Sequence, residues 1–467
     1  MRLFRCVIVY IVVWSLLSAG TVQAALFGEF TIQDEKELGQ KINRLVRSKF
    51  DVLNDPAVTA YVREISQRIE NELPPQPFPI SVTVVRDSSM NAFAAPAGYM
   101  FVHTGLLLYL QSETQLAGVL AHELAHVTQR HIARNIERSQ LINLGTLAGM
   151  LAGVFLGGDS EGGEALAMGS LAGGQAAALK YSREDEREAD HIGLQYLWQA
   201  GYSGAGMVEA FEVIQKRKWL SGHSIPTYLS THPGVGERIT SLEQRVKAQQ
   251  SEHADASSRF ARIQALIRAK YTDPQSALKA LHQSDVVTDT CLLELGRGIV
   301  FMRLQQMAKA QAAFEHALSC APQDPLVQRE AGQFLYRQGD VARAQRLLKA
   351  ALEQRSQDTL AMWWYAKSLA ETGDREQSVE ELQRILRYDQ ENAEAHAYLG
   401  RLQGQMGHIF QAHLHLAYAV LYGDEGGDLP FHVQKAESLA ASPQAQKKVQ
   451  ALQEAVAHYK EMEKLAP

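Results

Sequence analysis

A period of 34 residues runs through the second half of the chain and constrains its fold more than any other feature. A fixed period of this length is typical of stacked two-helix repeats, in which small residues allow close helix packing and larger ones fill the space between. Glycines at 339, 373 and 407 fall where the chain must turn between two helices. Four sets of residues recur at the spacing: Gly298, Gly332, Ala366 and Gly400; Ala310, Ala344, Ser378 and Ala412; Phe314, Leu348, Leu382 and Leu416; Ala317, Ala351, Ile385 and Ala419.

This repeat resembles the tetratricopeptide repeat (TPR). It departs from the consensus in two ways, because Pro322 is the only proline near a repeat end and the usual tryptophan is missing. The resemblance implies an all-α solenoid over residues 251–467, clearest over 291–424, whose concave surface binds peptides or partner proteins. A helical bundle without repeats is the alternative.

The polar stretch KAQQSEHADASS, residues 247–258, separates these repeats from the first half of the chain. Residues 25–250 alternate between helical and strand-like patterns, so we expect an α+β domain there. The chain as a whole is then predominantly helical.

The first 24 residues have the pattern of a secretory signal. Arg2 and Arg5 precede an apolar run, and small residues end at Ala24, where we expect cleavage. An uncleaved anchor is the alternative, since the apolar run is only slightly too short for a membrane span, but the small residues at the cleavage site favour removal. We therefore expect an exported protein, in the periplasm of a bacterium, without a stable transmembrane span after cleavage.

Charge and cysteine content narrow the expected partners and bonds. The formal charge of −6 is spread without long runs of one sign, which argues against nucleic acid or an anionic membrane as a partner. Cys291 and Cys320 remain after signal cleavage, and two cysteines in an oxidising compartment predict one disulfide. Two independent buried cysteines are the alternative.

The stretch LAGVLAHELAHVTQRH, residues 116–131, contains the pattern His-Glu-x-x-His. A capping box that begins at Ser112 starts a helix just before it, so His122 and His126 share one face. Two imidazoles four residues apart reach one metal ion, and Glu123 can approach a water bound to that ion. A helix with surface histidines is the alternative, which the apolar neighbours of the motif disfavour.

A catalytic zinc needs a third protein ligand. The extended pattern with a third histidine fails, because His131 lies one position away from the required place. The segment YSREDEREADHIG, residues 181–193, offers Glu184, Glu186 and Glu188. Glu186 has Asp190 on its own helical face, where that carboxylate could orient a zinc-bound histidine. A solvated charged helix is the alternative.

Taken together, these segments resemble the zinc metallopeptidases that include HtpX and the CAAX prenyl endopeptidases. The resemblance rests on the His-Glu-x-x-His motif, on the later Glu-x-x-Ala-Asp of residues 186–190, and on NAFAAPAGYMFVHTGLL, residues 91–107. It implies a zincin-like fold with one Zn²⁺ per chain, bound by His122, His126 and Glu186, and Glu123 as general base. With a signal and C-terminal TPRs, the chain resembles the periplasmic members that act as proteases and chaperones in outer-membrane protein assembly.

That resemblance also implies a fourth zinc ligand. The resemblance assigns this fourth ligand to His232, in the segment THPGVGERI, residues 231–239. As a ligand, His232 would inhibit the peptidase. A neutral imidazole there would occupy the position that the catalytic water needs. The alternative is a structural turn, with His232 hydrogen-bonded and Arg238 paired to a nearby carboxylate.

Two segments stay open at this stage. YMFVHTG, residues 99–105, is either a sheet edge that pairs with an extended substrate or an internal strand. Residues 141–175 contain ten glycines and suit a mobile lid, a buried helical hairpin or a membrane contact.

The sequence therefore predicts a zinc endopeptidase that captures and cleaves misfolded or stalled envelope proteins. Its expected partners are unfolded or misassembled outer-membrane proteins and, through the TPR surface, the outer-membrane assembly machinery. The alternative is mainly a chaperone or assembly scaffold with a dormant or repressed metal site.

Overall fold

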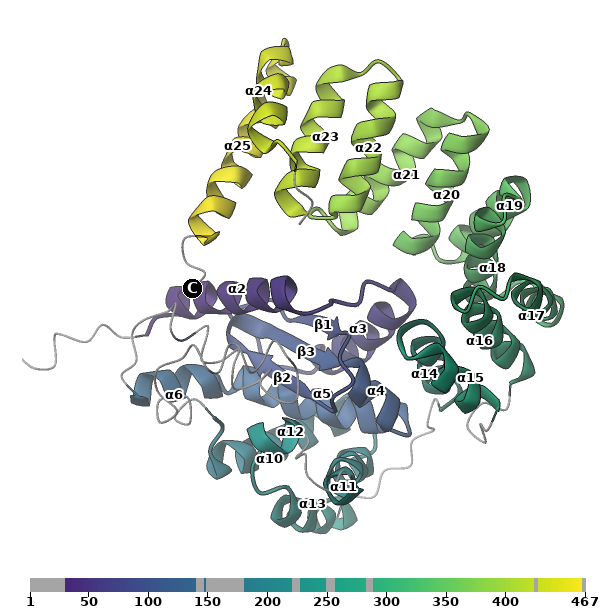
Figure 1. Cartoon of the computed structure of the whole chain (residues 1–467). Helices are drawn as coiled ribbons and strands as arrows, with labels where there is room; N and C mark the ends of the chain where they lie inside the picture. Colours follow the sequence, from purple (N-terminus) through teal and green to yellow (C-terminus); the bar gives the residue numbers. More distant parts are fainter. Residues whose placement is uncertain are drawn as a thin grey trace, which may run out of the picture. The chain divides into compact units, whose positions relative to one another are not determined.

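The computed structural model describes residues 30–139, 147, 180–220, 227–248, 257–282, 289–423 and 427–463. Helices dominate this part of the chain, and one small sheet lies in its first half, as predicted (Figure 1). Two compact units result, of which the first comprises Met1–Val52, Ser66–Leu110 and Thr114–Ala254. The second comprises Leu53–Ile65, Gln111–Glu113 and Asp255–Pro467. The predicted signal and, except for Leu147, the glycine-rich segment 141–175 lie outside the described residues.

The sheet has three strands, β1 (Ser81–Val85), β2 (Ala92–Ala95) and β3 (Tyr99–His103), in the order β1-β3-β2. β3 runs parallel to β1 and antiparallel to β2. The short turn η2 (Pro96–Gly98) joins β2 to β3, and Gly98 has a φ of 81° there. Of the two alternatives for residues 99–105, the sheet edge is wrong, because β3 is the central strand and β1 and β2 are the outer strands.

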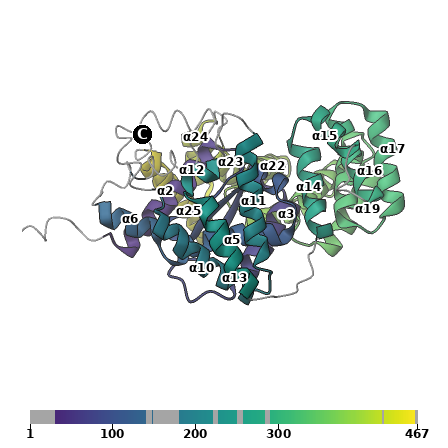
Figure 2. The same ribbon diagram turned by 90° about the horizontal axis from the view of Figure 1, so that it is seen from below.

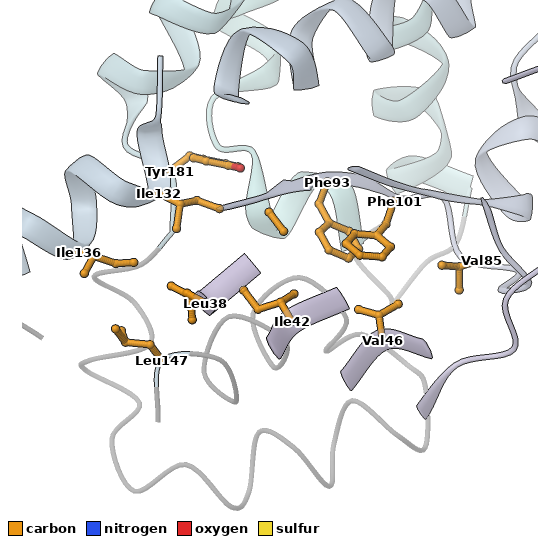
Figure 3. Packing of buried hydrophobic residues seen from close by; sticks show 11 residues of the cluster. Leu38, Ile42, Val46, Val85, Phe93, Phe101, Ile132, Ile136, Leu147 and Tyr181 are labelled. Carbon is orange, nitrogen blue, oxygen red and sulfur yellow. The ribbon is translucent and has the colours of Figure 1, made fainter. Parts of the chain in front are cut away.

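Helix α2 (Ile32–Lys49) covers one face of this sheet. Thr31 and Asp34 form a capping box at its start, and apolar residues then recur about every four positions. Leu38, Ile42 and Val46 are fully buried against the aromatic pair of Phe93 and Phe101 (Figure 3), whose rings stack with centroids 4.9 Å apart. Burial of this apolar stripe stabilises the sheet from one side.

Helix α5 (Glu113–Thr128) begins directly after Ser112, as the capping box predicts, and carries the His-Glu-x-x-His motif. Helix α10 (Arg183–Gln199) packs closely on it at Gly193, where a Cβ atom would lie 2.8 Å from the backbone oxygen of Ala121. α11 and α13 lie side by side in both views (Figures 1 and 2). The remaining helices of this half are α3 (Pro56–Glu70), α4 (Thr104–Tyr109), α6 (His131–Ser139), α11 (Ala205–Leu220), α12 (Thr227–Thr231) and α13 (Val235–Ala248).

The second unit contains the predicted repeats as antiparallel helix pairs. The second helices of four pairs begin at Met307, Val341, Arg375 and Ile409, 34 residues apart. The pairs are α16 (Thr290–Arg303) with α17 (Met307–Cys320), α18 (Pro325–Arg337) with α19 (Val341–Gln354), α20 (Thr359–Thr372) with α21 (Arg375–Tyr388), and α22 (Ala393–Gln405) with α23 (Ile409–Tyr422). Helices α14 (Ser257–Tyr271) and α15 (Pro274–His282) precede them, and α24 (Leu429–Leu439) and α25 (Pro443–Glu463) follow.

The periodic residues pack as the sequence predicts. A Cβ atom at Gly332 would lie 2.8 Å from Leu348, and one at Gly400 would lie 2.8 Å from Leu416, so a small residue is required opposite each leucine. Gly339, Gly373 and Gly407 have positive φ angles at the turns. The solenoid prediction is therefore confirmed down to these contacts.

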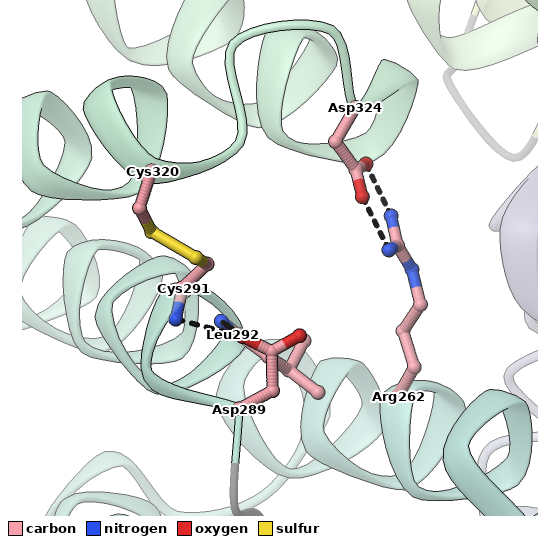
Figure 4. The surroundings of a disulfide bond; sticks show 6 residues. All are labelled: Arg262, Asp289, Cys291, Leu292, Cys320 and Asp324. Atoms are coloured by element: carbon pink, nitrogen blue, oxygen red, sulfur yellow. Dashed lines mark hydrogen bonds and ion pairs between the residues drawn. A yellow bond between two sulfur atoms is a disulfide. The ribbon is translucent and has the colours of Figure 1, made fainter.

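The two remaining cysteines belong to one helix pair. Their Cα atoms lie 5.8 Å apart, and Figure 4 shows the sulfur atoms of Cys291 and Cys320 joined. This spacing lies within the range that a disulfide requires, below about 7 Å. Asp289 caps the helix that begins beside Cys291. Formation of the bond in an oxidising compartment stays a prediction.

Candidate metal centre

Four buried side chains converge in the first unit. His122, His126, Glu186 and His232 each present one potential ligand atom, and these atoms lie within 4.8 Å of one another. The Nε2 atoms of His122 and His126 are 3.1 Å apart, and Nε2 of His126 is 3.4 Å from Oε1 of Glu186. Nδ1 of His232 lies 2.9 Å from the same carboxylate oxygen. Three elements far apart in the sequence, α5, α10 and the segment after α12, thus meet at one point.

Asp190 and Arg238 support this cluster from behind. Oδ1 of Asp190 lies 3.1 Å from Nδ1 of His122, the ring nitrogen that faces away from the cluster. Arg238 donates to both oxygens of Asp190, from Nε at 2.7 Å and from Nη2 at 2.6 Å, and its Nη1 donates to Glu186. One guanidinium therefore orients both the carboxylate in the cluster and the carboxylate that holds His122.

Glu123 lies beside the cluster with one oxygen held and the other available. Its Oε2 accepts a hydrogen bond from the backbone N–H of Ala94 in β2, at 3.0 Å. Within the described part of the chain, Oε1 accepts no hydrogen bond, although Nε2 of His232 lies 3.5 Å away. The edge strand thus fixes the carboxylate while one oxygen faces the cluster.

Aromatic rings enclose the histidines. The ring of Tyr181 stacks on His126 with centroids 3.7 Å apart, and Tyr228 stacks on His232 at 4.2 Å. Phe211 meets His122 edge-on at 5.5 Å. These contacts exclude water from the cluster and limit rotation of the imidazole rings.

The electrostatics of Glu123, Glu186 and His126 match their expected roles, whereas hydrogen bonds to Asp190 and Glu186 outweigh burial and raise the pKa of His122. Burial raises the pKa of Glu123 to about 7. Burial would also raise the pKa of Glu186, but the charges of Arg238 and His232 outweigh it and hold that pKa well below its usual value. Burial lowers the pKa of His126 well below its usual value, so its imidazole is neutral. A neutral imidazole and an ionised carboxylate are the forms that bind a metal.

The residue types and their spacing fit a metal ion. Three imidazoles and one carboxylate form a nitrogen and oxygen donor set, and that set matches the tetrahedral sites of zinc. The Nε2 atoms of His122 and His126 approach each other closely at a buried position, where one ion can reach both. The side chains that orient them, Asp190 and Arg238, are also arranged as around known zinc sites.

Among the candidate third ligands, the structure brings only Glu186 to the two histidines. Glu184 is exposed and pairs with Arg187, whereas Glu188 accepts from Arg134. The sequence analysis missed Tyr181 and the backbone of Ala94. Tyr181 lies in the segment 181–193 and Ala94 in the segment 91–107, but no residue pattern in these segments indicates the orientation of the two groups.

Comparisons with known proteins agree with this geometry. The sequence pattern of peptidase family M48 matches residues 53–246, and a tetratricopeptide repeat pattern matches residues 335–402. A putative beta-barrel assembly-enhancing protease of Vibrio cholerae is 32% identical over 289 residues, which are 60% of this chain and 59% of that protein. The beta-barrel assembly-enhancing protease of Escherichia coli K12 is 27% identical over 301 residues, covering 62% and 61%.

Another relative matches a shorter part of the chain. The mitochondrial metalloendopeptidase OMA1 of Arabidopsis thaliana is 32% identical over 173 residues, which are 35% of this chain and 31% of that protein. The chain spans about three fifths of the length of the two bacterial relatives. In the described residues, no helix is both long and apolar enough to cross a membrane.

Proposed function

Because the chain carries a domain of peptidase family M48 followed by tetratricopeptide repeats, we propose that it is a zinc-dependent endopeptidase that acts on outer-membrane proteins. In this proposal residues 25–250 form the peptidase domain and residues 251–467 form the TPR domain. The observation that carries it is the buried group of His122, His126 and Glu186, with an available oxygen of Glu123 beside it.

His122, His126 and Glu186 would hold one Zn²⁺, and Asp190 and Arg238 would orient them. The bound ion would supply Lewis-acid polarisation of the scissile carbonyl and a more acidic water. Glu123 takes a proton from the attacking water through Oε1 and later passes it to the leaving amine. The hydrogen bond from Ala94 keeps the Glu123 carboxylate directed at that water during both transfers.

The free edge of β2 supports an extended polypeptide as substrate. The N–H of Ala94 donates to Glu123, and its carbonyl oxygen accepts from the hydroxyl of Tyr181 at 3.3 Å. Both groups therefore point away from β3, and a substrate strand that paired with Ala94 would have to displace the Tyr181 hydroxyl from its carbonyl oxygen. A pocket beside His126, lined by Ala94 to Gly98, Arg130 and Tyr181, lies along the same edge. Extended segments of unfolded chains meet these requirements, whereas folded domains do not.

His232 is assigned to restraint of this activity. Its Nδ1 faces the other ligand atoms, 3.4 Å from Nε2 of His122, and its ring is 0% exposed. A fourth protein ligand would occupy the open position that a catalytic zinc needs. Cleavage would then require the segment that carries His232 to move, a gating step of the kind known for active-site loops.

The substrates and the compartment follow from the relatives and from the N-terminus. Two relatives are described as beta-barrel assembly-enhancing proteases. We assign this chain to the same process in the periplasm, where cleavage of the signal after Ala24 would release it. Its TPR surface would contact the assembly machinery, and its peptidase domain would degrade misfolded or stalled outer-membrane proteins.

A second candidate is a TPR chaperone whose metal site stays repressed. The complete burial of His122, Glu123 and Glu186 favours it, because an enclosed site admits no substrate without rearrangement. The first candidate cleaves substrates in a reaction that depends on Glu123, whereas the second candidate does not cleave them.

The test compares the purified full-length protein with its Glu123→Gln variant. Glutamine keeps the size of the side chain but cannot accept the proton, so we expect retained zinc and casein cleavage reduced by about a hundredfold or more. Both proteins should suppress aggregation of an unfolded outer-membrane protein equally. Unchanged cleavage by the variant would contradict the peptidase mechanism, and no cleavage by the parent in any condition would favour the chaperone.

The ligand set is tested by Glu186→Ala. This variant should contain less zinc by elemental analysis, whereas Glu184→Ala, which changes an exposed carboxylate on the same helix, should retain it. Equal zinc in Glu186→Ala and the parent would remove Glu186 from the ligand set.

A further inference from the structure

His131 is a buried histidine next to the cluster that the proposed chemistry does not use. It begins helix α6 and is 0% exposed. Its position in the sequence does not match that of a third zinc-binding histidine. The structure places its Nδ1 atom 2.7 Å from Nδ1 of His126. It therefore lies behind a proposed ligand, on the side away from the other ligand atoms.

The hydrogen bonds of these two rings fix where their protons lie. His126 faces the cluster with Nε2, so a ligand there needs its lone pair on Nε2 and its proton on Nδ1. That N–H donates to Nδ1 of His131. His131 must then carry its own proton on Nε2, and this atom lies 3.1 Å from the carboxylate oxygen Oε2 of Glu188. Each ring thus has one N–H donor and one acceptor nitrogen. The N–H of His126 donates to His131, and the N–H of His131 donates to Glu188.

Glu188 is itself held at the far end of this chain of bonds. Nη2 of Arg134 donates to the same oxygen, Oε2, at 2.6 Å. Arg134 and His131 both lie on α6, one turn apart, and Glu188 lies on α10 two residues after Glu186. The helix that supplies the carboxylate ligand therefore also anchors the support for the histidine ligand.

We propose that His131 is a positioning residue that fixes the tautomer and the orientation of His126 for zinc. Metal-bound histidines usually donate their second ring N–H to a carboxylate, a carbonyl or a water. Here a second histidine is inserted between the ligand and the carboxylate, and Tyr181 holds the ligand ring from its face. The inference rests on the proposed function, because it takes His126 as a ligand.

A second metal site at the same place is the competing interpretation. His131, Asp185 and Glu188 present potential ligand atoms within 4.8 Å of one another. Arg134 already places its positive charge 2.6 Å from Glu188 and 3.8 Å from Asp185. Asp185 also accepts from the backbone N–H and the hydroxyl of Ser182 in the capping box of α10. These carboxylates are neutralised and occupied, so we assign the group to support of His126.

The test measures the zinc affinity of the metal-free, full-length protein by competition with a chromophoric chelator. Loss of the hydrogen-bond partner of a metal-bound histidine typically weakens zinc binding by about 10- to 100-fold. We expect a decrease of this size for His131→Leu. His131→Asn keeps an acceptor oxygen close to the position of Nδ1 and should recover part of the affinity. His191→Leu, which removes an exposed histidine of α10, should bind zinc like the parent.

The outcomes separate this inference from the function that it rests on. A parent protein that binds no zinc would overturn both. A parent that binds zinc together with a folded His131→Leu variant of equal affinity would overturn the inference alone. The same holds if His131→Asn binds as weakly as His131→Leu, since an acceptor would then have no role.

A further variant covers the case in which His131→Leu does not fold. Glutamine places its amide one methylene farther out than asparagine, so His131→Gln should bind zinc more weakly than His131→Asn. Circular dichroism without metal checks that both amide variants fold like the parent. Equal affinities of these two variants would overturn the inference.

Discussion

His232 carries the contacts that bear most directly on control of the site. Its ring stacks on Tyr228, its Nδ1 faces the ligand atoms, and its Nε2 lies 3.5 Å from Oε1 of Glu123. One imidazole thus contacts both the proposed metal position and the proposed base. Gly234, two residues later, has a φ of 78°, a conformation that glycine adopts without strain, and nothing lies within 4 Å of the position that a Cβ atom would take.

Replacement of this imidazole should raise the proposed peptidase activity. We expect His232→Ala to keep zinc through the other three ligands and to raise basal cleavage of casein about tenfold, equivalent to about 1.4 kcal/mol. The measurement is initial cleavage rate together with zinc content, and the exposed His191→Ala serves as the control. A variant that keeps its zinc and its fold but cleaves no faster than the parent would show that His232 does not restrain the site.

The packing of α10 on α5 positions Glu186 and Asp190. Gly193 permits this approach, because a Cβ atom there would lie 2.8 Å from the oxygen and 3.0 Å from the carbonyl carbon of Ala121, one residue before His122. Backbone atoms of a buried helix cannot move aside easily. The distance between these two helices therefore sets the distance between the carboxylates and the histidines.

We expect Gly193→Ala to separate the helices, destabilise the first unit by about 1–3 kcal/mol and weaken zinc binding. Gly404→Ala is the matched control, since its Cβ would make an ordinary contact of 3.6 Å with Ala412. That change should be neutral or stabilising by up to about 0.5–1 kcal/mol, because it removes a glycine from the last turn of α22. Chemical denaturation and chelator competition measure the two effects, and equal behaviour of both variants would contradict the packing argument.

The α16–α17 pair carries the predicted disulfide. In exported protein that is denatured without a reductant, we expect no free thiol, because the Cα atoms of Cys291 and Cys320 already lie at bridging distance. Replacement of both cysteines by alanine should lower the free energy of unfolding of the repeats by about 2–4 kcal/mol. Two free thiols per chain in a quantitative thiol assay would exclude the bridge.

Buried charges in the second unit join a segment from early in the chain to the repeats. Arg329 of α18 is 0% exposed and donates to Asp55 at 3.1 Å and to Asp358 at 3.0 Å. Lys270 of α14 lies 2.7 Å from Asp55. Burial would raise the pKa of Asp55, but these two cations outweigh it and hold the pKa well below its usual value.

Removal of the buried arginine should therefore be costly. Arg329→Met leaves carboxylates without their main partner, and we expect a loss of about 3–5 kcal/mol in the free energy of unfolding of the second unit. Arg259→Met is the matched control, because Arg259 also binds a carboxylate of the early segment, Glu64, but both side chains are more than half exposed. Its loss should cost less than about 1 kcal/mol. Similar urea denaturation midpoints for the two variants would contradict the buried-pair argument.

Features that follow from residue spacing within one helix or one repeat can be predicted from the sequence. The 34-residue period fixed the helix pairs and the contacts of Gly332 and Gly400, because identical repeats stack identically. The spacing of His122 and His126 placed both rings on one face of a helix that Ser112 begins, since three to four residues complete a helical turn.

Contacts between side chains of different elements are defined only in the folded chain, because they depend on how those elements pack. Glu184, Glu186 and Glu188 lie at every second position of one helix, and the close contact at Gly193 turns Glu186 toward the histidines. The same packing places His131 behind His126, Ala94 beside Glu123, and Asp55 beside Arg329. These partners are separated along the chain by 5 to 274 residues. No periodicity relates such positions, because their approach follows from side-chain volumes and backbone paths that only the folded chain defines.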